Sequence, residues 1–274
     1  MVYANNVITS FIPNTASSSL FLILKNLTSL LDSAGIPLTS YNSILTGDGS
    51  YTDRDDQAVV QSANYAQVVR QDYDYFARFY YLNDPGLDDM GDSETTTTIY
   101  DFDAQPYLLV DDTLIFKSSG DLNIDLSGTL SPGGPGSKQI VFVAGDIHFL
   151  NSSHLTSITS LSQGEFLAFI ANGTITFADT IGYADPTTNP TSVAPNVSGL
   201  FVADKIVIDS NSGTDRKFIG EGTFVGWDSF ELGRDYDSAT NNYDPTEVFI
   251  YRPDLVLSAP ERIKQPINVW QEIL

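Results

Sequence analysis

Carboxylates are the residues of this sequence with the clearest capacity for chemistry. The chain has 274 residues, with 35 Asp and Glu, two His and no Cys. Hard oxygen ligands suit Ca²⁺, which takes six to eight of them. Clustered aspartates occur in two runs, residues 53–56 and 84–92, and neither run has the spacing of an EF-hand. The alternative interpretation is that these aspartates lie in turns and face solvent. We expect no cofactor, and the weak calcium candidates are Asp53, Asp55, Asp56, Asp84, Asp88, Asp89 and Asp92.

The sequence gives little evidence for a zinc site, a nucleophilic cysteine or serine, or a nucleotide-binding site. His148 and His154 have no third partner nearby, which makes a poor zinc site. Without cysteine there is no thiolate ligand or nucleophile, and nucleotide-binding and serine-hydrolase motifs are absent. A polysaccharide hydrolase or lyase with paired carboxylates stays open as an alternative to a non-enzymatic protein. The outward positions that could serve it are few: Asp121, Asp146, Thr174, Lys205 and Asp228.

The charge and the hydropathy of the chain exclude two classes of binding partner. Lys and Arg number 13, so the formal net charge is −22. Such a surface repels nucleic-acid phosphate and anionic lipid. The most apolar run, Ser19–Leu31, is interrupted by Lys25 and is too short to span a bilayer. We therefore expect no nucleic-acid binding and no membrane insertion of this segment.

One short pattern recurs along the second half of the chain. Each copy has an apolar run, a small or polar corner, and a run in which apolar and polar residues alternate. Repeats of 20 to 50 residues are typical of solenoids and propellers, because one unit cannot bury its apolar face alone. The copies are TLIFKSSGDLNID (Thr113–Asp125), QIVFVAGDIHFL (Gln139–Leu150), EFLAFIANGTITFA (Glu165–Ala178), GLFVADKIVID (Gly199–Asp209) and GTFVGWDSFEL (Gly222–Leu232).

Alternation assigns the inward residues of these copies. Ile147 and Phe149 should point to the interior while Asp146 and His148 point outward, and the pairs Ile175/Phe177 and Ile206/Ile208 should follow them inward. A stack of hairpins, with Gly-Asp and Asn-Gly as two-residue turns, is the competing interpretation. We favour a mainly β fold in which residues 105–246 form a right-handed β-solenoid resembling a β-helix.

The remaining segments are expected to complete that solenoid. Residues 1–14 read as a strand that joins it, and residues 15–104 as a helical insertion packed on it, with helices near 20–31 and 57–82. The aromatic run Tyr73–Tyr81 could stack on carbohydrate, but we favour packing on the solenoid. Residues 247–274 contain three prolines, which cannot donate to a strand ladder, and suit a C-terminal cap.

Several segments together resemble a known group of proteins. They are VYANNVITSFIP, DYDYFARFY, IVFVAGDIHF, FLAFIANGTITF, KFIGEGTFVGWDSFELGRD and EVFIYRPDLVLSAPERIKQPINVWQEI. The chain is similar to the C-terminal module of uncharacterised secreted cell-surface or pilus-associated proteins of candidate phyla radiation bacteria. The resemblance covers nearly the whole chain and implies an extracellular β-solenoid, with no known catalytic residues to transfer.

Three functions follow from these observations. The first is a non-enzymatic extracellular surface module for adhesion or for cell-surface or filament assembly, with a glycan or a protein surface as ligand. The second is a carbohydrate-active enzyme on a β-helix. The third is a structural filament subunit that self-associates through a solenoid end. An acidic groove would favour the enzyme, exposed aromatic side chains would favour glycan adhesion, and uncapped complementary ends would favour assembly.

Overall fold

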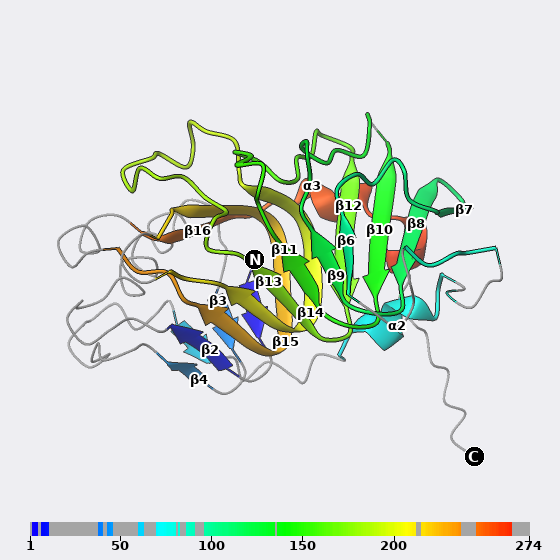
Figure 1. Ribbon diagram of the computed structural model, residues 1–274. Coiled ribbons are helices and arrows are strands. Elements are labelled where there is room, and N and C mark those ends of the chain that lie inside the picture. The colour runs from blue at the N-terminus through cyan, green and yellow to red at the C-terminus, as the bar shows by residue number, and fades with distance from the viewer. Residues whose placement is uncertain are drawn as a thin grey trace, which may run out of the picture.

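The chain forms a β-solenoid whose coils stack along one axis (Figure 1). The computed structural model describes residues 70–80, 82, 86–90, 96–134, 136–211, 215–236 and 245–264, and the strand backbones at 2–4, 7–10, 38–40, 43–45 and 60–62. All strand pairs are parallel except that of β7 with β8. Stacked parallel strands, rather than hairpins, therefore account for the repeats.

Two sides of the stack carry the strand ladders. Along the first side lie, in order, β5 (Val60–Ser62), β3 (Leu38–Ser40), β1 (Val2–Ala4), β15 (Phe218–Leu232), β14 (Val197–Ile208), β12 (Phe166–Ala171), β10 (Lys138–Val143), β8 (Thr113–Ser118) and β7 (Leu108–Val110). Along the second side lie β4 (Ser43–Leu45), β2 (Val7–Ser10), the later parts of β15 and β14, β13 (Thr174–Phe177), β11 (Ile147–Phe149), β9 (Leu122–Ile124) and β6 (Thr97–Ile99).

Stacked phenylalanine rings fill the interior of the coils. Phe169 and Phe201 lie parallel with centroids 5.6 Å apart, and Phe201 and Phe224 at 4.8 Å continue the column along the first side. From the second side, Phe149 meets Phe169 edge to face at 4.9 Å. The inward positions predicted by alternation are confirmed, because each is fully buried: Ile147, Phe149, Ile175, Phe177, Ile206 and Ile208.

The outer surface of the first side is also apolar and is covered by a short helix. Phe142 and Ile170 of neighbouring strands are fully buried although they point away from the interior. Helix α2 (Tyr73–Ala77) and the turn after it lie on this surface, where Tyr73 meets the Phe142 ring at 6.0 Å and Tyr80 meets it at 5.6 Å. The predicted packing of the aromatic run on the solenoid is therefore confirmed for these residues.

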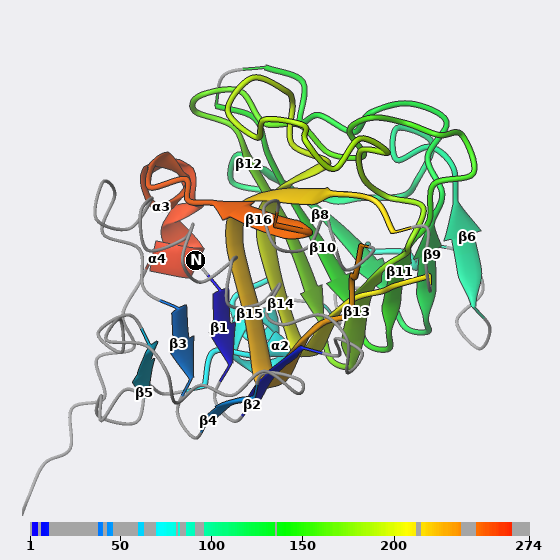
Figure 2. The same ribbon diagram turned by 90° about the vertical axis from the view of Figure 1, so that its left-hand side faces the viewer.

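The N-terminal strands join the stack out of chain order. Strands β1 and β2 pair with β15, the last long coil, and β3, β4 and β5 continue beyond them (Figure 2). Residues 15–104 were expected to form a helical insertion, and that prediction is wrong for β3, β4, β5 and β6. The three residues of β5 fall inside the helix expected at 57–82. Local spacing suggested a helix there, but strand pairing with the growing stack determines the outcome. The helix expected near 20–31 lies outside the described residues.

The starts of β14 and β15 form a third side of the stack with β16 (Glu247–Ile250). From there the C-terminal segment runs back toward the first coil. Strand β16 pairs with the start of β15. Two short helices follow, α3 (Asp254–Ser258) and α4 (Glu261–Lys264), and Arg262 reaches Asp111 at 2.8 Å beside the first coil. On the first two sides, the edge of β15 is covered by β1 and β2 instead. Residues 1–14 thus join the solenoid as predicted, but their place at this edge was not predicted.

Candidate functional site

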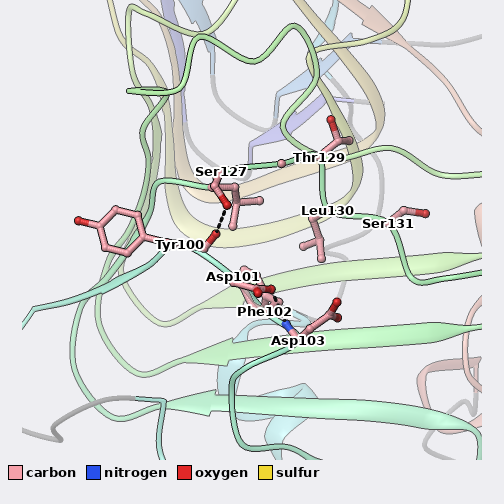
Figure 3. A pocket seen from close by; sticks show the side chains of 10 residues that line it. Tyr100, Asp101, Phe102, Asp103, Ser127, Thr129, Leu130 and Ser131 are labelled. Atoms are coloured by element: carbon pink, nitrogen blue, oxygen red, sulfur yellow. Dashed lines mark hydrogen bonds between the residues drawn. The ribbon is translucent and has the colours of Figure 1, made fainter.

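A pocket of about 210 Å³ lies at the end of the stack where the first coil begins (Figure 3). One wall is residues 100–103, which follow β6, and the other is residues 126–131, which follow β9. The amide and hydroxyl of Ser127 both donate to the carbonyl of Tyr100, at 3.2 and 3.4 Å. The two walls are therefore joined at one point and diverge from it.

The first wall is held rigidly by a buried ring and a tight turn. Phe102 is buried and meets Phe116 edge to face at 5.5 Å, so it closes the interior at this end. The Asp101 carboxylate accepts a hydrogen bond from the Asp103 amide at 2.9 Å. The Gln105 amide donates to the Phe102 carbonyl at 3.0 Å. This turn places two carboxylates and an exposed tyrosine on one short loop.

The pocket offers oxygen atoms and one aromatic ring. Asp101, Asp103, Ser127, Thr129 and Ser131 all line it. The Tyr100 ring is 60% exposed and points away from the other labelled side chains of the pocket, while its carbonyl faces Ser127 (Figure 3). Among the residues that the structure describes, no Lys, Arg or His lines this pocket. Such a surface can accept hydrogen bonds from hydroxyl or amine groups, and it repels anions.

The predicted calcium ligands are only partly within the described residues. Asp89 accepts hydrogen bonds from the Ser119 hydroxyl at 2.8 and 2.9 Å, and it lies 3.7 Å from the Lys117 ammonium. Asp88 is exposed. Asp53, Asp55, Asp56, Asp84 and Asp92 lie outside the described residues. In the part of the chain that the structure describes, no three His, Cys, Asp or Glu side chains are grouped to hold a metal. Asp89 thus serves to hold its segment against the first coil.

The two histidines occupy different surroundings. His148 is partly buried on the outward face of β11, opposite Asn123 and Thr176 of the neighbouring strands. His154 is exposed in the following loop, with a φ of 53°. Neither belongs to a metal-binding group among the described residues.

The corner residues, considered for the enzyme hypothesis, connect coils. The Asp121 carboxylate accepts from the Asp146 amide, and the Asp146 carboxylate accepts from the Thr174 amide. The Lys205 ammonium lies 2.6 Å from a Glu231 carboxylate oxygen. The register pairs Lys205 with Ser229 and not with Asp228, because β14 and β15 shift register after Ala203. These contacts give the corner residues structural partners.

An arginine that sequence reasoning missed joins the next two corners to α2. The Arg70 guanidinium contacts Asp72 at 2.8 Å, Asp228 at 3.0 Å, and Asp204. Burial raises the pKa of the Asp204 carboxyl, and the Arg70 charge opposes that rise. The Trp227 indole also donates to the Gln71 carbonyl at 3.1 Å. No local pattern links residue 70 to these corners, so the sequence held no signal for this cluster.

A second missed group is a fully buried arginine at the corner that follows β15. Arg234 is 1% exposed and donates to the carbonyl of Ala178 at 2.8 Å, of Arg216 at 2.8 Å and of Asp209 at 3.1 Å, and also to that of Ile181. Its backbone amide donates to the buried Glu247 carboxylate at 2.8 Å. Burial lowers the pKa of Arg234 and raises that of Glu247 to about 7. This group connects three coils with β16.

Comparisons with known proteins add no functional assignment. No family model, no curated protein and no solved structure matches the chain. Among the described residues, no helix combines the length and the apolar character needed to cross a bilayer. The case for a function therefore rests on the pocket and on the arrangement of the strands.

Proposed function

We propose that this chain is a non-enzymatic extracellular surface module that contributes to adhesion by binding a neutral or amino-bearing glycan in the pocket of the first coil. The observation that carries the proposal is a cavity lined by the oxygen atoms of Asp101, Asp103 and Ser127, with the exposed Tyr100 ring on the outer side of the same loop. The extracellular location is supported by the resemblance of the sequence to secreted surface proteins.

Carbohydrate chemistry fits this combination. A sugar ring presents apolar C–H groups on its face and hydroxyl groups at its edge. An aromatic ring can contact the C–H face of the sugar, and carboxylate oxygens can accept hydrogen bonds from its hydroxyl groups. Because no cationic side chain of the described residues lines the pocket and the chain carries a net charge of −22, uronate and sulfated glycans are disfavoured.

The solenoid suits a binding site that must keep its shape. Phe102 fixes the first wall through the Phe116 and Phe169 rings, and the parallel ladders run without a break from there to the last coil. Sites on such rigid elements need little ordering when a ligand binds, which preserves affinity. A rigid binding site of this kind suits a protein that binds a glycan for adhesion.

Screening of the purified chain on a glycan array, followed by calorimetric titration of the best neutral or amino glycan, tests the proposal. Tyr100→Ala and Asp103→Asn should each weaken binding about tenfold or more, which corresponds to roughly 1.4 kcal/mol. Tyr107→Ala is the matched control, because this tyrosine is 53% exposed nearby but does not line the pocket. Equal binding by all variants, or cleavage of the glycan during incubation, would contradict the proposal.

A further inference from the structure

The N-terminal strands fill the edge of the coil that comes last in the chain. We call strands β1 to β5 the N-terminal unit. Val2 lies opposite Phe224 on the first side, and Val7 lies opposite Ser229 on the second. The strand pairs of this unit are made with β15 or within the unit itself. Figure 2 shows β1 and β3 beside β15, with β5 beyond them.

Residue numbers along the axis show what this arrangement means. They rise from β8 through β10, β12 and β14 to β15, and then restart at β1 and rise again through β3 to β5. The unit therefore stacks on β15 as the next coils of the chain would. An unpaired edge of β15 would expose a row of backbone donors and acceptors ready to pair with another strand. Every copy of the chain carries both this edge and the unit that matches it.

We propose that the edge of β15 is also an interaction surface for a second copy of this chain, whose N-terminal unit pairs there in the same register. The exchanged contacts are identical to those made within one copy, which is the condition that makes domain swapping a low-cost route to association. A second copy is the expected partner because its β1 and β2 can pair with β15 in the register seen within one copy. This inference goes beyond glycan adhesion and concerns the opposite end of the body.

The number of residues between the unit and the body limits how far the unit can move from its own edge. The chain from Ser62 to Arg70 can extend to about 27 Å at most. Strand β5 lies three strand positions beyond β15, which is roughly 14 Å along the axis. Arg70 itself is held beside the β14 and β15 corners by Asp204 and Asp228. The greatest length that these residues can span therefore exceeds the axial separation between β5 and β15.

Concentration and salt should control the balance between the closed and exchanged forms. A connection of so few residues limits the effective concentration to roughly the millimolar range, so a dilute copy closes on itself. Copies crowded on a surface approach that concentration and can exchange. The net charge of −22 opposes their approach, and added salt screens this repulsion. Exchange should therefore increase with both protein concentration and ionic strength.

A chain without cysteines allows a direct test by disulfide trapping. Two single variants, Val7→Cys and Ser229→Cys, are mixed, unfolded, refolded together at low and at high concentration, and oxidised. Paired residues on adjacent strands lie about 4.8 Å apart, within the range that a disulfide spans. Because each variant carries one cysteine, a mixed disulfide at this site forms only when β2 of one copy pairs with β15 of another.

The expected result is a Val7–Ser229 disulfide heterodimer whose yield rises at least severalfold from low to high concentration and again with salt. The matched control mixes His148→Cys with Thr176→Cys, a pair from adjacent strands inside the body, and should give only background cross-linking. The double variant Val7→Cys/Ser229→Cys should close within one copy at low concentration, which verifies the register. Failure of the double variant to close, or heterodimer at the control level under all conditions, would overturn the proposal. Glycan binding can succeed or fail independently of either outcome.

Discussion

The Oδ1 atom of Asp121 accepts a hydrogen bond from the backbone amide of Asp146 at 2.9 Å, one coil further along the stack. The Asp146 carboxylate repeats the contact with the amide of Thr174 at 2.7 Å. Each carboxylate thus satisfies a donor at the corner where two strand ladders meet. Two successive steps of the solenoid are joined by the same chemistry.

Removal of one such carboxylate should destabilise the fold. We expect Asp146→Ala to lower the free energy of unfolding by about 1–3 kcal/mol, because the Thr174 amide loses a charged acceptor. Asp146→Asn keeps an acceptor oxygen and should lose less. Urea unfolding at neutral pH measures the difference, with Asp88→Ala at an exposed position as control. Equal losses for Asp146→Ala and the control would contradict the structural role.

Glycine is required beside each of these carboxylates. A Cβ atom at Gly173 would collide with Oδ1 of Asp146, and one at Gly145 would collide with Oδ1 of Asp121. We expect Gly173→Ala to cost about 1–3 kcal/mol of stability through overpacking. Gly128→Ala is the control, since nothing lies within 4 Å of its added methyl group.

A double-mutant cycle tests the cause of that loss. In an Asp146→Ala background the colliding oxygen is gone, so Gly173→Ala should cost less than it does in the unaltered chain. Strict additivity of the two substitutions in urea unfolding would show that the carboxylate is not what excludes a side chain at Gly173.

Repetition and alternation in the sequence were sufficient to predict the solenoid. An alternating run such as Ile147–Phe149 has the same inward residues whichever strand it pairs with, so its buried face can be inferred locally. The position of Val2 beside Phe224 could not be inferred in that way. Pairing between strands more than 200 residues apart depends on how well two strand edges fit each other. The local spacing of apolar residues carries no information about that fit.

The candidate pocket was beyond sequence reasoning for a related reason. No pattern in the sequence distinguishes Asp101 and Asp103 from the other acidic residues, because their significance depends on Ser127 lying across the cavity from them. Of the candidate calcium ligands that the structure describes, Asp89 accepts hydrogen bonds from Ser119 and Asp88 is exposed. Composition identifies acidic residues but does not say which of them face a cavity.

The buried Arg234 should be the most sensitive single position of the corner after β15. Arg234→Met keeps much of the side-chain volume but removes the donors to the carbonyls of Ala178, Asp209 and Arg216. We expect a loss of about 3–5 kcal/mol, measured by urea unfolding. Arg216→Met is the control, because this partly exposed arginine makes one long contact, 3.4 Å to the Gly182 carbonyl. A smaller loss for Arg234→Met than for the control would contradict the assignment.

The carboxyl group of Glu247 should make stability depend on pH. Burial raises its pKa from 4.5 to about 7, although the Thr246 hydroxyl, the Arg234 amide and the Arg234 charge favour ionisation. Between these values the folded chain holds a proton that the unfolded chain has released. The contribution of this group is therefore fully present below pH 4.5, falls as the pH rises to about 7, and is constant above that.

Glu247→Gln isolates this effect, because the amide resembles the protonated acid and retains an oxygen for the Arg234 N–H. The free energy of unfolding of the unaltered chain, relative to the variant, should fall between pH 4.5 and 7 by at most about 1.4 kcal/mol per pH unit. Comparison of the two chains by urea unfolding cancels other buried acids, including Asp215, whose pKa burial also raises. Parallel stability curves across this range would show that the pKa of Glu247 is not raised in the folded protein.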